Sequence, residues 1–396
     1  MNTNNSSRIE LIDALRGYAL MGLFLVHMVE YYEVLWYSPP AVLHPITKWM
    51  FNLFGGKAYA MFGMLFGVSF YIIMQRNAER GVDFRLRFLW RLMLLLMLGY
   101  LHGLVYCGEV LQILAIAGLL LVPLWFAPSW LLLTISVALL LQVSAFGFMA
   151  WITTHPALYQ QPFYVAVQKV VYPFYAHGNF AEVIAANAIG GTQAKWLFML
   201  ESGRFANIVG LSLLGFWLAK NEFFTNTQRF GKLYLRLLFC FAALAALCYH
   251  FTPALVKIFE DSRISDVWLE IIYMYFNTTV MFCTVLLLIV LYGYTPIQKI
   301  LGLLAAPGRM TLSFYVGQSL LMVPFFYHFG FGAYRWIGPW ENLLLAIALW
   351  VIQVALAHWY LTKYNFGPLE WCWRAATFGT THIPMKKSHQ SANNTA

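Results

Sequence analysis

The first apolar stretch of the chain carries Asp13, Arg16, His27 and Glu30 within a segment long enough to span a membrane. A helix turns about 100° per residue, so the eleven-residue step from Arg16 to His27 returns to nearly the same face about 16 Å along the axis. Ionisable groups at membrane depth are costly and usually mark a pathway or a reaction site. The alternative is a packing face on which Asp13 and Arg16 only pair with each other at the membrane edge.

His27 and Glu30 have the residue types and spacing of a general base and its orienting partner. Glu30 follows His27 by three residues, so its carboxylate could hold the imidazole ring and stabilise the charged form. His102 and Glu109 supply a second pair of the same types. A hydrogen-bonded structural histidine is the alternative, but titratable groups that cluster at one depth favour a reaction site.

Further ionisable residues gather at two depths of the expected spans. Near one end lie His27, Glu30, Lys57, His102, Glu109, Glu201 and Arg204. Near the other end lie Asp13, Arg16, Arg91, Arg309, Glu370 and Arg374. The span centres are apolar apart from Gln318, and protein partners must replace water around the charged groups, so we predict that these groups converge on a cavity. The arginines suit phosphate groups, with headgroup anchoring as the alternative for Arg309 and Arg374.

A metal site is not expected. His27, His102, Glu30 and Glu109 could together ligate a metal ion, but no two of them have the i, i+4 spacing of a specific site. The five cysteines are odd in number and lack CxxC spacing, which indicates neither a disulfide framework nor a thiolate site. The chain also lacks a glycine-rich nucleotide loop, an HExxH motif and a GxSxG motif.

The composition places this chemistry in a membrane. Hydrophobic residues make up 61% of the 396 residues and charged residues only 10%, which leaves too little polar surface for a soluble globule. We therefore expect an all-α, polytopic bundle of about ten transmembrane helices. The expected spans are 11–36, 53–75, 88–106, 109–127, 129–152, 197–219, 233–252, 268–293, 310–328 and 342–362.

Small residues predict how some of these helices meet. The third and fourth spans are separated only by a short stretch around Cys107 and Gly108, so they should form an antiparallel hairpin. Gly67 and Gly99 each lie one turn from another glycine, and such pairs let helix backbones approach closely.

The distribution of Lys and Arg predicts the orientation. With cytoplasmic termini, fifteen of the 25 basic residues fall on the cytoplasmic side, six on the opposite side and four at membrane depth. The positive-inside rule therefore places both termini in the cytoplasm, which requires an even number of spans. The net charge of +9 reflects this topology and does not indicate nucleic-acid binding, because the basic residues form no patch with stacking aromatics.

The chain is expected to form one domain. Residues 9–380 form the transmembrane domain, preceded by a short cytoplasmic terminus, 1–8, without a cleavable signal. A disordered cytoplasmic tail, 381–396, follows. The longest external segment, 153–196, mixes aromatic and polar residues and should lie on the membrane surface or roof a cavity. The absence of an internal repeat argues against transporter folds built from inverted halves.

Five segments resemble a known family. They are DALRG (13–17), GKAYAMFGMLFGVSF (56–70), YLHGLVYCGEVLQILAIAGL (100–119), APGRMTLSFYVGQSLL (306–321) and FGPLEWCWRAATF (366–378). In this order they resemble the YeiB-like bacterial membrane proteins, the domain-of-unknown-function family 418. That family is similar to the transmembrane acyltransferases, which include the lysosomal heparan-glucosaminide acetyltransferase and the family 3 sugar O-acylases.

The resemblance implies an activity in which acyl-CoA enters from the cytoplasm and the acyl group reaches an acceptor at the opposite face. The family 3 O-acylases have an Arg and a His eleven positions apart in the first helix, and Arg16 and His27 reproduce that interval. Most YeiB-like chains instead have Asn at the position of His27. The heparan acetyltransferase places its histidine beyond the first span, where His44 stands here. Glu109 replaces the Asp that is usual in the hairpin.

Together, the residues and the resemblance predict a membrane acyltransferase of the bacterial inner membrane that uses acetyl-CoA. Its expected acceptor is an envelope glycan or lipid-linked sugar, membrane lipids are further expected partners, and a homo-oligomer is left open. The expected catalytic residues are His27, Glu30, His102 and Glu109. The expected donor-binding residues are Arg16, Asp13, Arg309 and Gln318. The expected acceptor-binding residues are Lys57, Glu201 and Arg204. The alternatives are a transporter or lipid-interacting protein, in which the same charges couple ions or gate a substrate, and a purely structural role.

Overall fold

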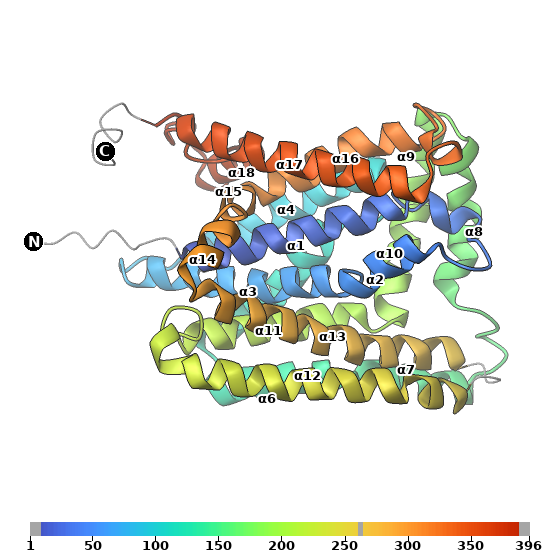
Figure 1. Cartoon of the computed structure of the whole chain (residues 1–396), viewed down its shortest axis with the longest axis horizontal. Coiled ribbons are helices and arrows are strands. Elements are labelled where there is room, and N and C mark those ends of the chain that lie inside the picture. Colours follow the sequence, from blue (N-terminus) through green and yellow to red (C-terminus); the bar gives the residue numbers. More distant parts are fainter. Residues whose placement is uncertain (1–8, 260–263, 388–396) are drawn as a thin grey trace, which may run out of the picture.

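The computed structural model of the chain describes residues 9–259 and 264–387. Over these residues it is a bundle of helices, and the pairing of Tyr364 with Lys386 is an isolated bridge outside any sheet (Figure 1). The prediction of an all-α membrane bundle is therefore confirmed at the level of fold class. The expected cytoplasmic terminus, 1–8, lies outside the described residues.

The described residues form eighteen α-helices. The first nine are α1 (Glu10–Val29), α2 (Pro45–Leu53), α3 (Lys57–Ala78), α4 (Arg85–Val105), α5 (Leu111–Leu121), α6 (Ser129–Leu140), α7 (Val143–Thr154), α8 (Phe163–His177) and α9 (Phe180–Ala186). The other nine are α10 (Thr192–Glu201), α11 (Arg204–Lys220), α12 (Thr227–Lys257), α13 (Ser265–Tyr292), α14 (Thr295–Gly302), α15 (Ala305–Arg309), α16 (Thr311–Phe326), α17 (Pro339–Lys363) and α18 (Pro368–Phe378).

The apolar runs of the sequence coincide with these helices, but not every helix is long enough to cross a membrane. Six candidates are long and apolar enough within the described residues, or up to eight if each bent helix pair is one span. Two further apolar helices, α5 and α16, are shorter. The chain is therefore a multi-pass membrane protein with several spans shorter or more bent than an ideal helix, which needs about 20 apolar residues.

Helix α1 runs through the middle of the bundle (Figure 1). We call the end where Ile9 lies the terminal end, because Lys387 lines a hollow there together with Glu10, and we call the opposite end the distal end. Helices α3, α15, α16 and α17 pack around α1, and most of its residues are buried. Polar side chains on such a helix must therefore find partners on its neighbours.

Two of the expected close helix contacts occur. A Cβ atom built on Gly67 of α3 would lie 1.8 Å from the carbonyl oxygen of Ser212 on α11. A Cβ atom on Gly99 of α4 would lie 2.8 Å from the amide nitrogen of Gln112 on α5. Small residues thus let these backbones touch, as predicted, and α4 and α5 form the expected hairpin.

The segment expected to lie outside the membrane is more ordered than the sequence indicated. It contains α8, then α9, a π turn at Asn187–Gly191 and α10. The helical stretch Phe180–Glu201 and α11 are together apolar enough for a span and meet at a bend of 69°. Part of the 153–196 segment therefore belongs to a broken span or a re-entrant loop and does not simply roof the bundle.

The last described residues of the chain, 381–387, pack against the helical bundle. Asn365 donates its backbone N–H to the carbonyl of Met385 (2.9 Å), and the Trp371 indole donates to the carbonyl of Ile383 (3.0 Å). Residues 381–387, expected to be disordered, are therefore held against α18. The rest of the expected tail, 388–396, lies outside the described residues.

Candidate functional site

A cavity of about 460 Å³ extends from the terminal end into the bundle. Along α1 its wall runs from Ile9 to Leu23, a rise of about 21 Å. His27 lies one turn further, about 6 Å beyond Leu23. The cavity therefore leads from the charged terminal end toward the predicted catalytic histidine.

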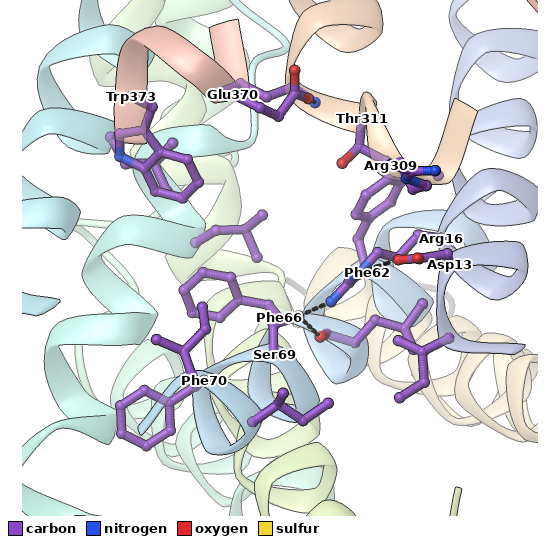
Figure 2. A pocket seen from close by; sticks show the side chains of 18 of the residues that line it. Asp13, Arg16, Phe62, Phe66, Ser69, Phe70, Arg309, Thr311, Glu370 and Trp373 are labelled. Carbon is purple, nitrogen blue, oxygen red and sulfur yellow. Dashed lines mark hydrogen bonds and ion pairs between the residues drawn. The ribbon is translucent and has the colours of Figure 1, made fainter. Parts of the chain in front are cut away.

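The charged residues predicted for this end all meet at this cavity. The residues that line it include Asp13, Arg16, Arg91, Arg309, Glu370 and Arg374. Asp13 and Arg16 lie beside Arg309 on one wall, and Trp373 lies across from them (Figure 2). The sequence pattern therefore identified a real convergence of helices that are far apart in the chain.

Arg16 is fixed by its own helix and by α3. Its Nη1 donates to Asp13 Oδ1 (2.8 Å), and its Nη2 donates to the Ser69 hydroxyl (2.5 Å). The Ser69 hydroxyl in turn donates to the carbonyl of Leu65 (2.5 Å). The Arg16 side chain keeps 23% of its surface exposed, so its guanidinium is held in place while still accessible from the cavity.

The other arginines rest on aromatic rings or on backbone. The Arg91 guanidinium lies 3.6 Å from the centre of the Trp373 ring, and Arg374 lies 4.4 Å from that of Phe366. Arg309 donates to the carbonyl of Asn365 (3.4 Å). Several arginines thus bring their positive charge to this end of the cavity, which suits an anionic ligand.

Glu370 has a structural task at the same wall. Its Oε1 accepts from the backbone N–H groups of Leu312 (2.7 Å) and Ser313 (3.1 Å), and its Oε2 accepts from the Ser313 hydroxyl (2.5 Å). It therefore satisfies unpaired donors at the amino-terminal end of α16. The carboxylate ties α18 to α16 and shapes the cavity wall.

The inner part of the cavity is apolar. Phe62, Phe66 and Phe70 of α3 line it at intervals of four residues, which places them on one helix face. At its inner end Tyr315 of α16 accepts a hydrogen bond from the backbone N–H of Val110 (3.0 Å). A ligand with an anionic head and a long, mostly apolar arm matches this change of polarity.

The predicted histidine and glutamate meet at the distal end. His27 Nδ1 lies 2.8 Å from Glu30 Oε1 and also 2.8 Å from the hydroxyl of Tyr106, which follows α4. The Trp36 indole donates to Glu30 Oε2 (3.2 Å). The predicted contact between His27 and Glu30 is thus present, and Tyr106 is a partner that sequence reasoning missed.

The backbone just after this pair is strained. Tyr31, Tyr32 and Glu33 have φ values of 52°, 51° and 80°, the left-handed region that residues other than glycine rarely adopt. Each such residue costs roughly 1–3 kcal/mol and persists only when its surroundings enforce it. Here Tyr32 is fully buried, and its carbonyl accepts from the Tyr327 hydroxyl (3.0 Å).

This turn brings a second carboxylate, that of Glu33, to the end of the bundle where His27 and Glu30 lie. Glu33 Oε2 accepts from the Tyr172 hydroxyl of α8 (3.1 Å). Burial, together with the nearby charge of Glu30, raises the pKa of Glu33 to about 8. We call His27, Glu30, Glu33, Tyr106 and Tyr172 the distal cluster. The three successive left-handed residues could not be read from the sequence, so Glu33 received no role there.

His102 lies between the distal cluster and the cavity. It is buried, and neither ring nitrogen has a hydrogen-bond partner among the described residues. Its ring centre is 5.4 Å from that of Tyr315, at the inner end of the cavity, and 6.1 Å from that of Tyr106. Buried polar groups usually have hydrogen-bond partners, so His102 remains a candidate functional residue.

Glu109 has a partner that the sequence did not predict. Lys195 of α10 donates to Glu109 Oε1 (2.8 Å), and the two side chains are 4% and 0% exposed. Glu109 Oε2 also accepts from the backbone N–H of Leu111 (2.8 Å). Glu109 therefore anchors the α4–α5 hairpin to α10, a task that would keep it from acting as a mobile catalytic group.

The residues predicted to bind an acceptor do not meet one another. Glu201 accepts from the backbone N–H groups of Phe163 (2.9 Å) and Tyr164 (3.1 Å) at the start of α8, so it caps that helix. Lys57 donates to the carbonyl of Phe51 (3.2 Å). These contacts are with backbone at other places in the bundle, because equal depth does not mean a shared helix face.

Arg204, Gln318 and His44 also have contacts outside the cavity. Arg204 pairs with Glu270 of α13 (3.4 Å). The Gln318 amide donates to Gln353 of α17 (2.7 Å), and Gln318 is not among the residues that line the cavity. His44 accepts from the backbone N–H of Ile46 (3.3 Å) at the start of α2. None of these contacts supports the roles predicted for Arg204 and Gln318.

The fold and this geometry define a class of protein: a multi-pass membrane protein with an anion-suited cavity that leads toward a histidine–carboxylate cluster. Two families match this chain. Residues 8–177 match the family described as "Heparan-alpha-glucosaminide N-acetyltransferase, catalytic". Residues 218–380 match "Protein of unknown function (DUF418)". The cavity is built from both regions, since α1, α3 and α4 lie in the first and α16 and α18 in the second.

Three bacterial proteins are similar to the chain over almost its whole length. It is 27% identical to "Uncharacterized protein YxaH" of Bacillus subtilis (strain 168), over 98% of each chain. It is 26% identical to "Uncharacterized 39.9 kDa protein in amylase 3'region" of Bacillus acidopullulyticus, over 94% of each. It is 22% identical to "Uncharacterized protein YeiB" of Escherichia coli (strain K12), over 95% of this chain and 98% of that protein. These matches confirm the resemblance of the chain to YeiB-like proteins and to the DUF418 family.

Proposed function

We propose that the protein is a membrane-embedded acyltransferase that moves an acyl group, acetyl in the simplest case, from acyl-CoA to an envelope glycan or lipid-linked sugar. The observation that carries this proposal is the course of the cavity. It begins among arginines, becomes apolar, and ends one helix turn from His27. The rise of about 16 Å from Arg16 to His27 is comparable to the reach of an extended pantetheine arm.

The residues divide the reaction between them. Arg16 and Arg309 bind the phosphate groups of the donor, and Asp13 holds Arg16 in place. His27 accepts the proton of the acceptor hydroxyl or amine as that group attacks the thioester carbonyl carbon and the CoA thiolate leaves. Glu30 orients His27 and stabilises the imidazolium that forms. His102 lies against Tyr315, which lines the inner end of the cavity, and a His102 ring N–H would bind the carbonyl oxygen there.

The topology that fits this function has ten membrane crossings, both termini in the cytoplasm and the donor entering from the terminal end. We assign the protein to the bacterial inner membrane. Reporter fusions at Ala396 and near Gln161 test the orientation. We expect the reporter to be cytoplasmic at Ala396 and external near Gln161, and an external Ala396 would contradict the topology.

A transfer assay tests the function directly. Inverted membrane vesicles containing the protein are supplied with acetyl-CoA labelled in the acetyl group, and lipid and glycan fractions are collected. We expect label in one of these fractions with the wild-type protein and a loss of that label with His27→Asn. This substitution leaves a polar side chain of similar reach but removes the base.

The same vesicles distinguish the alternative functions. The proposal would be overturned by two results together. The lipid and glycan fractions would carry no label, and acetyl-CoA would not protect the purified protein against heat. A transporter or lipid-interacting protein would then be the better interpretation, with the terminal arginines as gating or headgroup-binding groups.

A further inference from the structure

The strained turn after α1 holds a carboxylate that the proposed chemistry does not use. Glu33 ends the run of left-handed residues, and its Oε1 lies beside Gly108 in the loop between α4 and α5. A Cβ atom on Gly108 would lie 2.6 Å from Glu33 Oε1 and 2.5 Å from the Tyr106 hydroxyl. Glu33 and Tyr106 therefore face the same small space, which only a glycine at position 108 leaves open.

The Tyr106 hydroxyl in turn contacts His27. A neutral imidazole carries its proton on Nδ1 or on Nε2, and the partner of one nitrogen decides which. Nδ1 has two oxygen neighbours at 2.8 Å, the Glu30 carboxylate, which accepts when charged, and the Tyr106 hydroxyl, which can donate or accept. The direction of the Tyr106 O–H bond therefore influences the tautomer of His27.

Two arrangements are consistent with these contacts. If the Tyr106 O–H points toward Glu33, Nδ1 carries the proton between two acceptors and Nε2 is free to accept a proton. If the O–H points toward Nδ1, the ring proton moves to Nε2 and the free nitrogen faces Tyr106. A negative charge on Glu33 favours the first arrangement, because the O–H dipole turns toward it in a poorly solvated site.

We propose that Glu33 is a positioning residue that acts through the Tyr106 hydroxyl to keep the His27 proton on Nδ1 and leave Nε2 as the base. The inference deepens the proposed function, on which its catalytic meaning rests. It also assigns a purpose to the strained turn, which places Glu33 beside the α4–α5 loop. The strain is then retained because it places a second carboxylate at the histidine.

The groups around Glu33 come from several elements. The titratable and charged neighbours are Glu30 on its own segment, Tyr172 of α8, Tyr106 and Cys107 of the α4–α5 loop, Tyr315 and Tyr327 at α16, and Arg204 of α11. Burial and the charge of Glu33 raise the pKa of Tyr106, so its hydroxyl keeps a proton to direct. The charge of Glu33 itself changes near neutral pH, where its pKa lies.

The test observes the ring nitrogens of His27 by nuclear magnetic resonance in purified, full-length protein labelled in histidine. The signals of His27 among the 10 histidines are assigned by their loss in His27→Asn. Above pH 8, where Glu33 carries its charge, we expect Glu33→Gln to shift the His27 signals toward the Nε2–H form. Tyr106→Phe should leave the proton on Nδ1, because Glu30 remains as its acceptor. The double variant should give the same His27 signals as Tyr106→Phe, since Glu33 acts through the Tyr106 hydroxyl.

Two further variants distinguish a specific effect on His27 from a general folding defect. Tyr172→Phe keeps the Glu33 carboxylate but removes the hydrogen bond that holds it, and it should give a smaller shift in the same direction. Glu79→Gln removes an exposed carboxylate at the terminal end and should leave the His27 signals unchanged. His27 signals that stay at their wild-type positions in folded Glu33→Gln would overturn the inference.

The same measurement separates this inference from the proposed function. A tautomer that responds to Glu33 in a protein that transfers no acyl group would support the positioning role of Glu33 and refute only the acyltransferase. In active protein, Glu33→Gln should lower the rate at saturating acetyl-CoA without changing donor affinity, because Glu33 lies outside the cavity lining.

Discussion

The cavity and the distal cluster hold their polar side chains in different ways. In the cavity, the arginines contact Asp13, a hydroxyl, a backbone carbonyl and aromatic rings, and the inner walls are apolar. In the distal cluster, each polar group contacts another side chain, and the backbone is strained to achieve it. The first arrangement gathers positive charge around a cavity, whereas the second fixes side chains relative to one another.

This difference indicates which region binds and which reacts. Binding requires groups whose present partners are weak enough to be replaced or shared. General base chemistry requires a histidine whose ring orientation and tautomer are set before the substrate arrives. The cavity meets the first requirement and the distal cluster the second, so substitutions in the two regions should affect different kinetic parameters.

The largest effect is expected at His27. His27→Ala should lower acyl transfer by about 10²–10⁴-fold, the usual contribution of a general base, and leave acetyl-CoA binding nearly intact. Transfer assays in vesicles and binding to purified protein measure the two quantities separately. A wild-type rate in His27→Asn would show that His27 is not the base, and His44 and His102 would be the next candidates.

Breaking the ion pair that anchors the hairpin should affect stability more than chemistry. Lys195→Met leaves the Glu109 carboxylate buried without its charged partner, which costs about 3–5 kcal/mol in comparable sites. The double variant Lys195→Met/Glu109→Gln should recover part of this loss, because no uncompensated charge remains. Thermal unfolding in detergent measures both. A single variant as stable as the wild type would mean that the pair is not maintained in the membrane.

Arg16 tests the binding side of the comparison. Arg16→Ala should weaken acetyl-CoA binding by about 1.5–3 kcal/mol, the worth of a hydrogen bond to a charged group. Arg16→Lys should recover little if the contact is bidentate. Arg85→Ala is a matched control, since Arg85 lies at the same end, pairs with Asp83 and does not line the cavity. Equal affinities in all three variants would show that Arg16 only anchors its helix.

The smallest effect concerns pH and Glu33. Its pKa in the folded protein, about 8, lies above the ordinary value of 4.5. Between these values the folded protein holds a proton that the unfolded chain has lost, so this residue makes stability fall as pH rises. Thermal unfolding should therefore depend less steeply on pH in Glu33→Gln than in the wild type over this range. Parallel profiles would show that Glu33 is not buried beside Glu30 as described.

The sequence predicted the charged end of the cavity, which is built from helix ends, better than the distal cluster, which depends on a loop. The charged residues expected at one depth all line the cavity, because helix ends at the same membrane face are brought together by the topology itself. The contact between His27 and Glu30 was also predictable, since i, i+3 neighbours share a helix face. At the distal end, however, equal depth grouped Lys57, Glu201 and Arg204 with His27, and in the part of the chain that the structure describes none of the three has a hydrogen bond or ion pair with it.

The sequence by itself determined the membrane class, the apolar segments, and the face of the first helix that carries Arg16 and His27. These follow from composition and helical periodicity, which act along a single segment. Only the tertiary structure decided that Tyr106 and Glu33 join His27 and that Lys195 neutralises Glu109. Such contacts depend on how helices pack around one another and on a left-handed turn enforced by burial, and neither property is encoded in the spacing of residues along the chain.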